Sequence, residues 1–174
     1  TMDPGERGIP GADVRLLNTP WALRSSGNGN FAINNLPQGP YAIAVDLASL
    51  PIGFRLADKD RLRVAILDGQ VTEVKIPIIE VGQIRGRLFV DSNGNGVADS
   101  GEEGLLSQAV FLTGRNVSLE ARTVVFGQYV FDLVPLGSYT LRAAGREYAV
   151  TLDRNNKFVV LDIPLPASDT AARP

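Results

Sequence analysis

The chain has 174 residues, a formal net charge of −2 and a hydrophobic content of 44%. This composition fits one or two small folded domains and gives little support to nucleic-acid binding. Cysteine and histidine are both absent, which excludes disulfides, thiolate or imidazole metal sites, and nucleophile systems built on either residue. Any bound metal must therefore be held by oxygen, which points to calcium or magnesium. No apolar run reaches the ~18 residues that a membrane span needs.

Short alternating runs separated by turn residues predict an all-β chain, and 18 glycines with 11 prolines favour many turns. Close spacing of short strands is typical of β-sandwiches. In the first half we expect strands at 12–17, 21–25, 30–35, 40–46, 61–66 and 71–78. In the second half we expect them at 83–90, 108–113, 118–125, 128–132, 138–144, 147–152 and 157–164.

Two blocks of sequence occur twice. Asp3–Gly8 is echoed 96 residues later by Asp99–Gly104, and Gly29–Tyr41 is echoed 98 residues later by Gly127–Tyr139. A period near that length indicates tandem domains, each with its own core. We therefore expect a truncated β-sandwich module at 1–80, a complete module at 81–167 and a flexible tail at 168–174. The first module lacks its N-terminal strand, and of the loop that follows such a strand it keeps Asp3 and Glu6.

The second module carries a calcium-type loop. Residues 91–102 match the pattern D-x-[DN]-x-[DN]-G-x5-E, in which alternate side chains point their oxygens at one cation. The segment before the loop alternates like a strand and not like a helix. An Asn-Gly hairpin turn is the simpler interpretation, but it does not explain the acids at both ends of the loop. The expected calcium ligands are Asp91, Asn93, Asn95, the Val97 carbonyl, Asp99 and Glu102.

These residues support a family resemblance. The pattern Gly86-x-Leu88-x-x-Asp91-x-Asn-Gly-Asn-Gly96-x-x-Asp99-x-Gly-Glu102-x-Gly104 is followed by Gly127-x-Tyr129-x-Phe131-x-x-Val134-Pro135-x-Gly137-x-Tyr139. The chain resembles the B-domains of serine–aspartate repeat adhesins and the B-type, prealbumin-like modules of collagen-binding adhesins. The resemblance implies Ig-like β-sandwiches in tandem within secreted or cell-surface bacterial proteins, where they act as spacers. Several relatives bind calcium through the corresponding loop.

The leading functional hypothesis is a non-enzymatic structural module, stiffened by calcium, whose partners are neighbouring domains of the same longer chain. One alternative is an adhesin module that binds a glycan or an extracellular matrix protein, and another is an accessory domain of a larger enzyme. The absent first strand also predicts a strand-exchanged dimer through the first module, because exposed sheet edges recruit strands.

Aromatic residues recur at matching positions of the two modules. A carbohydrate-stacking platform is one interpretation, but strand periodicity favours core positions for Phe31, Tyr41, Tyr129, Phe131 and Tyr139. Trp21 has no counterpart in the second module, and we expect it to be buried.

Overall fold

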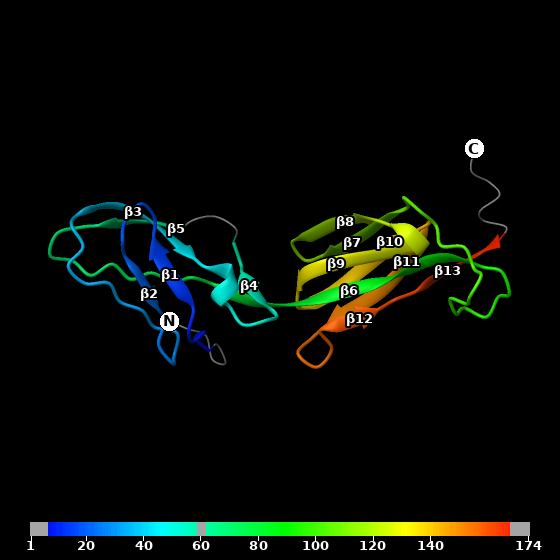
Figure 1. Cartoon of the computed structure of the whole chain (residues 1–174), viewed down its shortest axis with the longest axis horizontal. Coiled ribbons are helices and arrows are strands. Elements are labelled where there is room, and N and C mark those ends of the chain that lie inside the picture. Colours follow the sequence, from blue (N-terminus) through cyan, green and yellow to red (C-terminus); the bar gives the residue numbers. More distant parts are fainter. Residues whose placement is uncertain (1–6, 59–61, 168–174) are drawn as a thin grey trace. The chain divides into compact units, whose positions relative to one another are not determined.

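The computed structural model describes residues 7–58 and 62–167, which form β-strands, turns and two single-turn 3₁₀ helices (Figure 1). No α-helix occurs in these ranges, so the predicted all-β fold class is confirmed. The chain divides into two compact units, Thr1–Glu80 (unit 1) and Val81–Pro174 (unit 2). The expected tail at 168–174 lies outside the described residues.

Unit 1 is built on one four-stranded antiparallel sheet in the order β2-β1-β3-β5. Its described strands are β1 (Asp13–Leu16), β2 (Ala22–Arg24), β3 (Gly39–Val45), β4 (Phe54–Leu56) and β5 (Leu62–Ile66). The inner face of the sheet buries Val14, Leu16 and Ile43. The 3₁₀ helix η1 (Leu47–Ser49) follows β3, and β4 pairs with Ile78–Glu80 at the start of the next strand.

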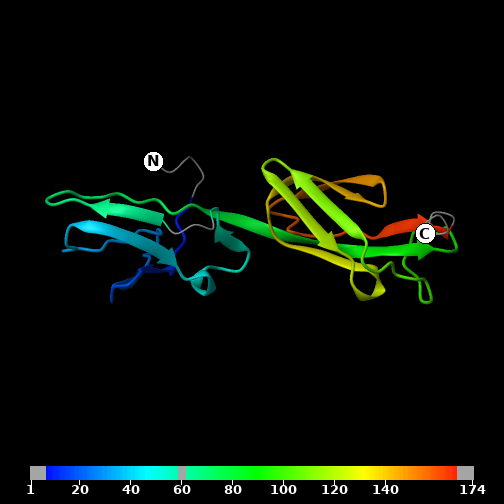
Figure 2. The same cartoon turned by 90° about the horizontal axis from the view of Figure 1, so that it is seen from above.

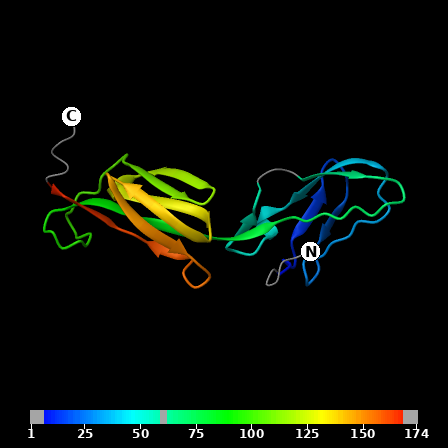
Figure 3. The ribbon, with the colours of Figure 1, turned by 180° about the vertical axis from the view of Figure 1, so that it is seen from behind.

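Two predicted strands of unit 1 are wrong. The segments 30–35 and 71–77 are not strands and run as coil (Figure 3). Their apolar side chains nevertheless pack against the sheet. A strand is defined by backbone bonds to a neighbour, and no neighbouring strand accompanies either segment in the described ranges. The sequence also gave no signal for β4, which is only three residues long.

Unit 2 is a two-layered sandwich (Figure 2). One sheet has the order β11-β10-β7-β8, and the other places β6 between β9 on one edge and β12 with β13 on the other. The strands are β6 (Ile78–Asp91), β7 (Ala109–Gly114), β8 (Val117–Arg122), β9 (Gln128–Pro135), β10 (Gly137–Ala143), β11 (Arg146–Leu152), β12 (Phe158–Val160) and β13 (Ile163–Pro166).

Alternation places the core of unit 2 between its sheets. In β10 every second side chain, Tyr139, Leu141 and Ala143, is buried, while those between them face solvent. Ile84 and Leu88 of β6 are fully buried in the same cluster. In β10 the buried side chains are therefore those that the sequence alternation identifies.

Several predicted strands of unit 2 have different bounds in the structure, and for two of them the cause is clear. The strand expected at 118–125 ends at Arg122, because the 3₁₀ helix η2 (Val125–Gly127) turns the chain there, with Phe126 in the left-handed region at φ 61°. The strand expected at 157–164 is divided into β12 and β13, which pair in parallel with successive parts of β6.

Candidate metal centre in the loop after β6

The loop 91–102 projects beyond the end of β6 (Figure 3). Its base is closed by backbone bonds, because the N–H of Val90 donates to the carbonyl of Glu103 at 2.8 Å and Leu105 donates to Leu88 at 2.9 Å. Asp91, the last residue of β6, also pairs with Pro166 of β13. The buried end of a central strand thus fixes the position where the loop begins.

The Asp91 carboxylate organises the first half of the loop. One oxygen accepts the backbone N–H of Gly94 at 2.7 Å and of Asn95 at 3.2 Å, and the other accepts that of Gly96 at 2.9 Å. This turn requires left-handed backbone at Gly94 and Gly96, with φ of 75° and 74°. Backbone N–H groups alone therefore wrap this half of the loop around the Asp91 carboxylate.

Two carboxamides connect this turn to Asp99. The Oδ1 atoms of Asn93 and Asn95 accept the N–H of Asn95 and Val97, at 3.0 and 2.7 Å. Their Nδ2 atoms both donate to one oxygen of Asp99, at 2.8 and 2.7 Å. These donors, that of Asn93 first, lower the pKa of Asp99 below its ordinary value because they favour the charged form.

Glu102 closes the loop with both of its oxygens. Oε1 accepts the N–H of Ser92 at 2.9 Å, and Oε2 accepts the N–H of Asp99 at 3.0 Å. The last acid of the pattern therefore contacts backbone next to the first acid, Asp91. Together the carboxylates of Asp91 and Glu102 accept five backbone N–H groups, which fixes both of them against the loop backbone.

Arg87 is a residue that sequence reasoning missed. Its guanidinium donates to the carbonyl of Glu102 at 2.7 Å and to that of Phe126 at 2.8 Å, and it lies 5.7 Å from the ring centroid of Phe89. Arg87 thus ties the end of the loop to β6 and to the η2 turn. Its position in β6, four residues before Asp91, was the only available signal.

The structure joins five of the six predicted ligands through the hydrogen bonds above. For the sixth, Val97, it records the N–H bonded to Asn95 and an exposed side chain. Within the described ranges, no three side chains among His, Cys, Asp and Glu form a metal-holding group, so the calcium site stays a prediction from the loop pattern. Asp3 and Glu6, the expected remnant of the first loop, lie outside the described residues.

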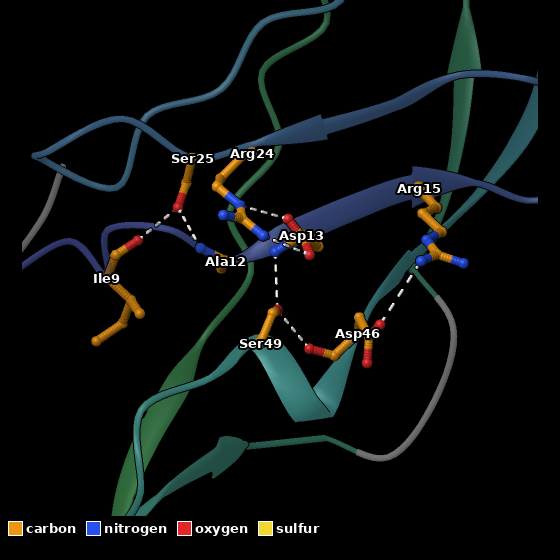
Figure 4. A network of polar contacts seen from close by, with 8 residues as sticks. All are labelled: Ile9, Ala12, Asp13, Arg15, Arg24, Ser25, Asp46 and Ser49. Carbon is orange, nitrogen blue, oxygen red and sulfur yellow. Dashed lines mark hydrogen bonds and ion pairs between the residues drawn. The ribbon is translucent and has the colours of Figure 1, made fainter.

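A buried hydroxyl network in unit 1 was also missed (Figure 4). The Ser25 hydroxyl donates to the carbonyl of Ile9 at 2.7 Å and accepts the N–H of Ala12 at 2.9 Å. Beside it, Arg24 forms an ion pair with Asp13 at 2.7 Å. Ser25, which follows β2, thus satisfies two backbone groups of the segment that leads into β1.

Unit 2 has the same network at matching positions. The Thr123 hydroxyl donates to the carbonyl of Leu105 at 2.5 Å and accepts the N–H of Gln108 at 2.8 Å. The 98-residue offset of the repeat carries Ser25 onto Thr123. The signal in the sequence was therefore a hydroxyl residue at the same position of both repeats.

The aromatic residues of unit 2 belong to the core, as the strand periodicity predicts. Tyr129, Phe131 and Tyr139 are buried, and the rings of Tyr129 and Phe131 meet edge to face at 6.1 Å. They cannot form an exposed stacking platform. Trp21, expected to be buried, is 43% exposed at the edge strand of unit 1, where no second sheet covers it.

Comparison with known proteins gives structural likenesses only. The chain matches no family model and no curated protein. It is similar to the Bacillus anthracis TIE protein, with 18% identity and a TM-score of 0.42, covering 93% of this chain and 32% of that one. The chain thus spans about a third of the TIE protein.

Two pilins are similar at the same level. For GBS52, a minor pilin of Streptococcus agalactiae, the identity is 14% and the TM-score 0.40, with 95% of this chain and 87% of that one covered. For SpaD, a major pilin of Corynebacterium diphtheriae, the values are 15% and 0.40, with 50% and 32% covered. Across the described ranges, neither helix has the length and hydropathy needed to cross a bilayer.

Proposed function

We propose that this chain is a non-enzymatic structural segment of a larger secreted or cell-surface bacterial protein, and that calcium bound at 91–102 stiffens unit 2. The surface location rests on the resemblance of its two sequence blocks to B-type adhesin modules. Its partners are then neighbouring domains of the same longer chain. The calcium part rests on the loop itself.

The observation that carries the calcium proposal is the backbone anchoring of Asp91 and Glu102 at the two ends of one loop. Backbone N–H groups hold both carboxylates of this twelve-residue loop in place, which reduces the conformational entropy that a cation must overcome. Carboxylate, carboxamide and carbonyl oxygens are the ligands that calcium prefers.

Charge supports the same proposal. Asp91, Asp99 and Glu102 put three acids within twelve residues, and the salt bridges recorded in the described part of the chain involve other acids. The amides of Asn93 and Asn95 supply partial positive charge to Asp99. A divalent cation would supply positive charge to these acids more strongly than the amides do.

Thermal unfolding of the whole chain with calcium and with chelator tests the proposal. With a Kd of about 1 mM, as in extracellular modules, ~10 mM calcium raises the free energy of unfolding by about 1.4 kcal/mol. For a unit of this size the Tm then rises by about 6–11 °C. Trp21 is the only tryptophan, so its fluorescence follows unit 1 while calorimetry records both units.

The expected result is a calcium-dependent shift of the calorimetric transition without a shift of the Trp21 transition. Glu102→Gln should remove the calcium shift, because a neutral amide cannot chelate the ion with two oxygens. Asp153→Asn is the matched control, since Asp153 caps an exposed turn of unit 2 by accepting N–H groups of Asn155 and Asn156. An equal calcium shift in the Glu102→Gln variant would refute the proposed site.

A further inference from the structure

Three asparagines of the chain are each followed directly by a glycine. They are Asn28 in unit 1 and Asn93 and Asn95 in the loop of unit 2. Each of these asparagines is exposed, and the glycine after each has left-handed backbone, with φ of 77°, 75° and 74°. Three steps with the same sequence, exposure and backbone conformation can therefore be compared by their hydrogen bonds alone.

An Asn-Gly step supports a reaction within the chain itself. The backbone nitrogen of the glycine attacks Cγ of the asparagine and forms a C–N bond, which closes a succinimide ring. The carboxamide nitrogen leaves as ammonia, taking up the proton of the glycine N–H. Water then opens the ring at either carbonyl and gives aspartate or isoaspartate. Glycine favours the attack because it has no Cβ, and asparagine is among the thermolabile residues.

Hydrogen bonds in the folded chain oppose this reaction. The carboxamide must rotate toward the next backbone nitrogen, and the N–H of that nitrogen must leave its acceptor. Both movements require local opening, whose free energy rises with the number and strength of the bonds that are broken. The contacts of each carboxamide and of each glycine N–H therefore set the order in which the three sites react.

The loop 91–102 holds both of its carboxamides at both ends. The Oδ1 atom of Asn93 accepts a backbone N–H at 3.0 Å, and its Nδ2 donates to Asp99 at 2.8 Å. For Asn95 the two corresponding distances are both 2.7 Å. Neither carboxamide can rotate without losing a bond to the Asp99 carboxylate.

The nucleophilic nitrogens of the loop are held as well. The N–H of Gly94 donates to the Asp91 carboxylate at 2.7 Å, and that of Gly96 donates to it at 2.9 Å. Hydrogen bonds to an ionised acceptor are about twice as strong as those between neutral groups. Both reacting groups of each loop step are thus bonded to a carboxylate.

Asn28 is held much less firmly. Its Oδ1 accepts a single bond, from the Ser26 hydroxyl at 3.3 Å, and among the described residues its Nδ2 has no acceptor. The N–H of Gly29 donates at 2.9 Å to the carbonyl of Ser26, which is a neutral group. Opening this turn therefore breaks fewer and weaker bonds than opening the loop of unit 2.

We propose that Asn28 is a site of spontaneous deamidation, and that the hydrogen bonds of the loop 91–102 protect Asn93 and Asn95 from the same reaction. The protection does not depend on calcium, because the bonds belong to the loop alone. It preserves the two carboxamides that the proposed calcium site would use.

The isoaspartate product would disturb unit 1 at a tight backbone contact. A Cβ on Gly8 would lie 1.8 Å from the carbonyl oxygen of Asn28, and a Cβ on Gly29 would lie 2.5 Å from Cα of Gly8. Isoaspartate carries the main chain through its own Cβ and so lengthens the turn by a methylene group, for which this contact leaves no room. The aspartate product keeps the length of the backbone and should fit the same turn.

Incubation of the whole chain at neutral pH, with chelator present, tests the inference. Trypsin releases the peptide 25–55, which contains Asn28, and the peptide 88–115, which contains Asn93 and Asn95. Mass spectrometry measures the loss of amide in each peptide, and enzymatic methylation identifies isoaspartate. In the folded chain Asn28 should react at least about tenfold faster than either loop asparagine. In urea all three should react at similar rates, because the bonds that distinguish them are lost.

Variants assign the protection to particular bonds. Asp99→Ala removes the acceptor of both loop amides and should raise the rates at Asn93 and Asn95 toward that of Asn28. Asp153→Ala, in an exposed turn of unit 2, is the matched control and should leave all three rates unaltered.

The stability of unit 1 checks the consequence of the reaction. Asn28→Gln should stop the fast reaction, since glutamine would have to close a larger ring. Thermal unfolding followed by Trp21 fluorescence should give the isoaspartate form a lower Tm than the parent chain, whereas Asn28→Asp should keep the parent Tm. An unchanged Tm in the isoaspartate form would refute the contact with Gly8 as the point of strain.

Two results would overturn the inference. One is equal rates at the three asparagines in the folded chain, or faster loss of amide in the loop than at Asn28. The other is the absence of reaction at Asn28 in the folded chain under conditions in which the urea-unfolded chain reacts.

Discussion

Ser25 and Thr123 form the same pair of hydrogen bonds, although 98 residues separate them in the chain. Each hydroxyl donates to a carbonyl of the segment before its unit's first hairpin and accepts an N–H from the start of that hairpin. Both are buried polar residues. A buried hydroxyl with two backbone partners is costly to remove, because both partners lose their bond without gaining water.

Thr123→Val should therefore destabilise unit 2 by about 1–3 kcal/mol, since valine keeps the shape but neither bond. Urea unfolding followed by circular dichroism measures the change. Thr113→Val is the matched control, because that exposed hydroxyl makes one long bond of 3.4 Å to Thr140. It should alter stability by less than about 0.5 kcal/mol. Equal effects of the two substitutions would contradict this account of Thr123.

Tyr41 of β3 and Tyr139 of β10 make the same hydrogen bond in the two units, so its contribution to stability can be compared. Tyr41 donates to Pro37 at 2.9 Å, and Tyr139 donates to Pro135 at 2.6 Å, but only Tyr139 is buried. We expect Tyr139→Phe to cost about 1 kcal/mol and Tyr41→Phe clearly less, since water can replace an exposed bond. Calorimetry of the two variants checks this order, and a larger loss for Tyr41→Phe would refute it.

Leu88→Ala tests the central position of β6. Leu88 is fully buried, so truncation should leave a cavity and cost about 2–5 kcal/mol. Val130→Ala, on the neighbouring strand but 47% exposed, should cost less than about 0.5 kcal/mol. Chemical denaturation of both variants measures the difference. A cost for Leu88→Ala as small as that of the control would mean that β6 is not the centre of the core.

Tyr129 should limit the stability of unit 2 at alkaline pH. Burial, reinforced by the nearby Asp162, raises the pKa of the Tyr129 hydroxyl, which donates to the carbonyl of Leu161 at 2.6 Å. Because the folded pKa exceeds the unfolded value of about 10, the stabilisation is complete below that pH and is lost as the pH rises above it. Thermal melts between neutral pH and pH ~11 measure the loss.

Tyr129→Phe should flatten this alkaline decline, at the expense of a lower stability at neutral pH. Tyr41→Phe, in unit 1, should leave the decline of unit 2 intact. If the Tyr129→Phe variant loses stability above pH ~10 as steeply as the parent chain, another group is responsible.

Asp99 should make the stability of unit 2 depend on pH in the acid range. The amides of Asn93 and Asn95 lower its folded pKa, so its stabilising contribution is present above the unfolded value of about 3.9. That contribution is lost as the pH falls through the lower folded pKa. Asp99→Asn should reduce the pH dependence of stability below pH ~4, measured by urea unfolding in chelator. A curve that parallels the parent chain would contradict the role of these amides.

Local sequence patterns predicted much of unit 2 because local and tertiary preferences agree there. Alternation identified the buried side chains of β10, and the calcium-type pattern identified the residues that the loop brings together. Arg87 was missed, since its contacts to Glu102 and Phe126 join segments distant in the sequence. Trp21 was misjudged because its exposure depends on the neighbours of an edge strand.

The sequence by itself determined the chemistry and the periodicity of this protein. Without cysteine or histidine, only oxygen can bind a metal, and turn residues with alternating runs dictate an all-β chain. The tertiary structure decided which extended runs became strands. Residues 128–132 pair with β6 while the similar run 30–35 pairs with no strand in the described ranges. The physical reason is that side-chain alternation is local, whereas the backbone bonds of a strand require a neighbour.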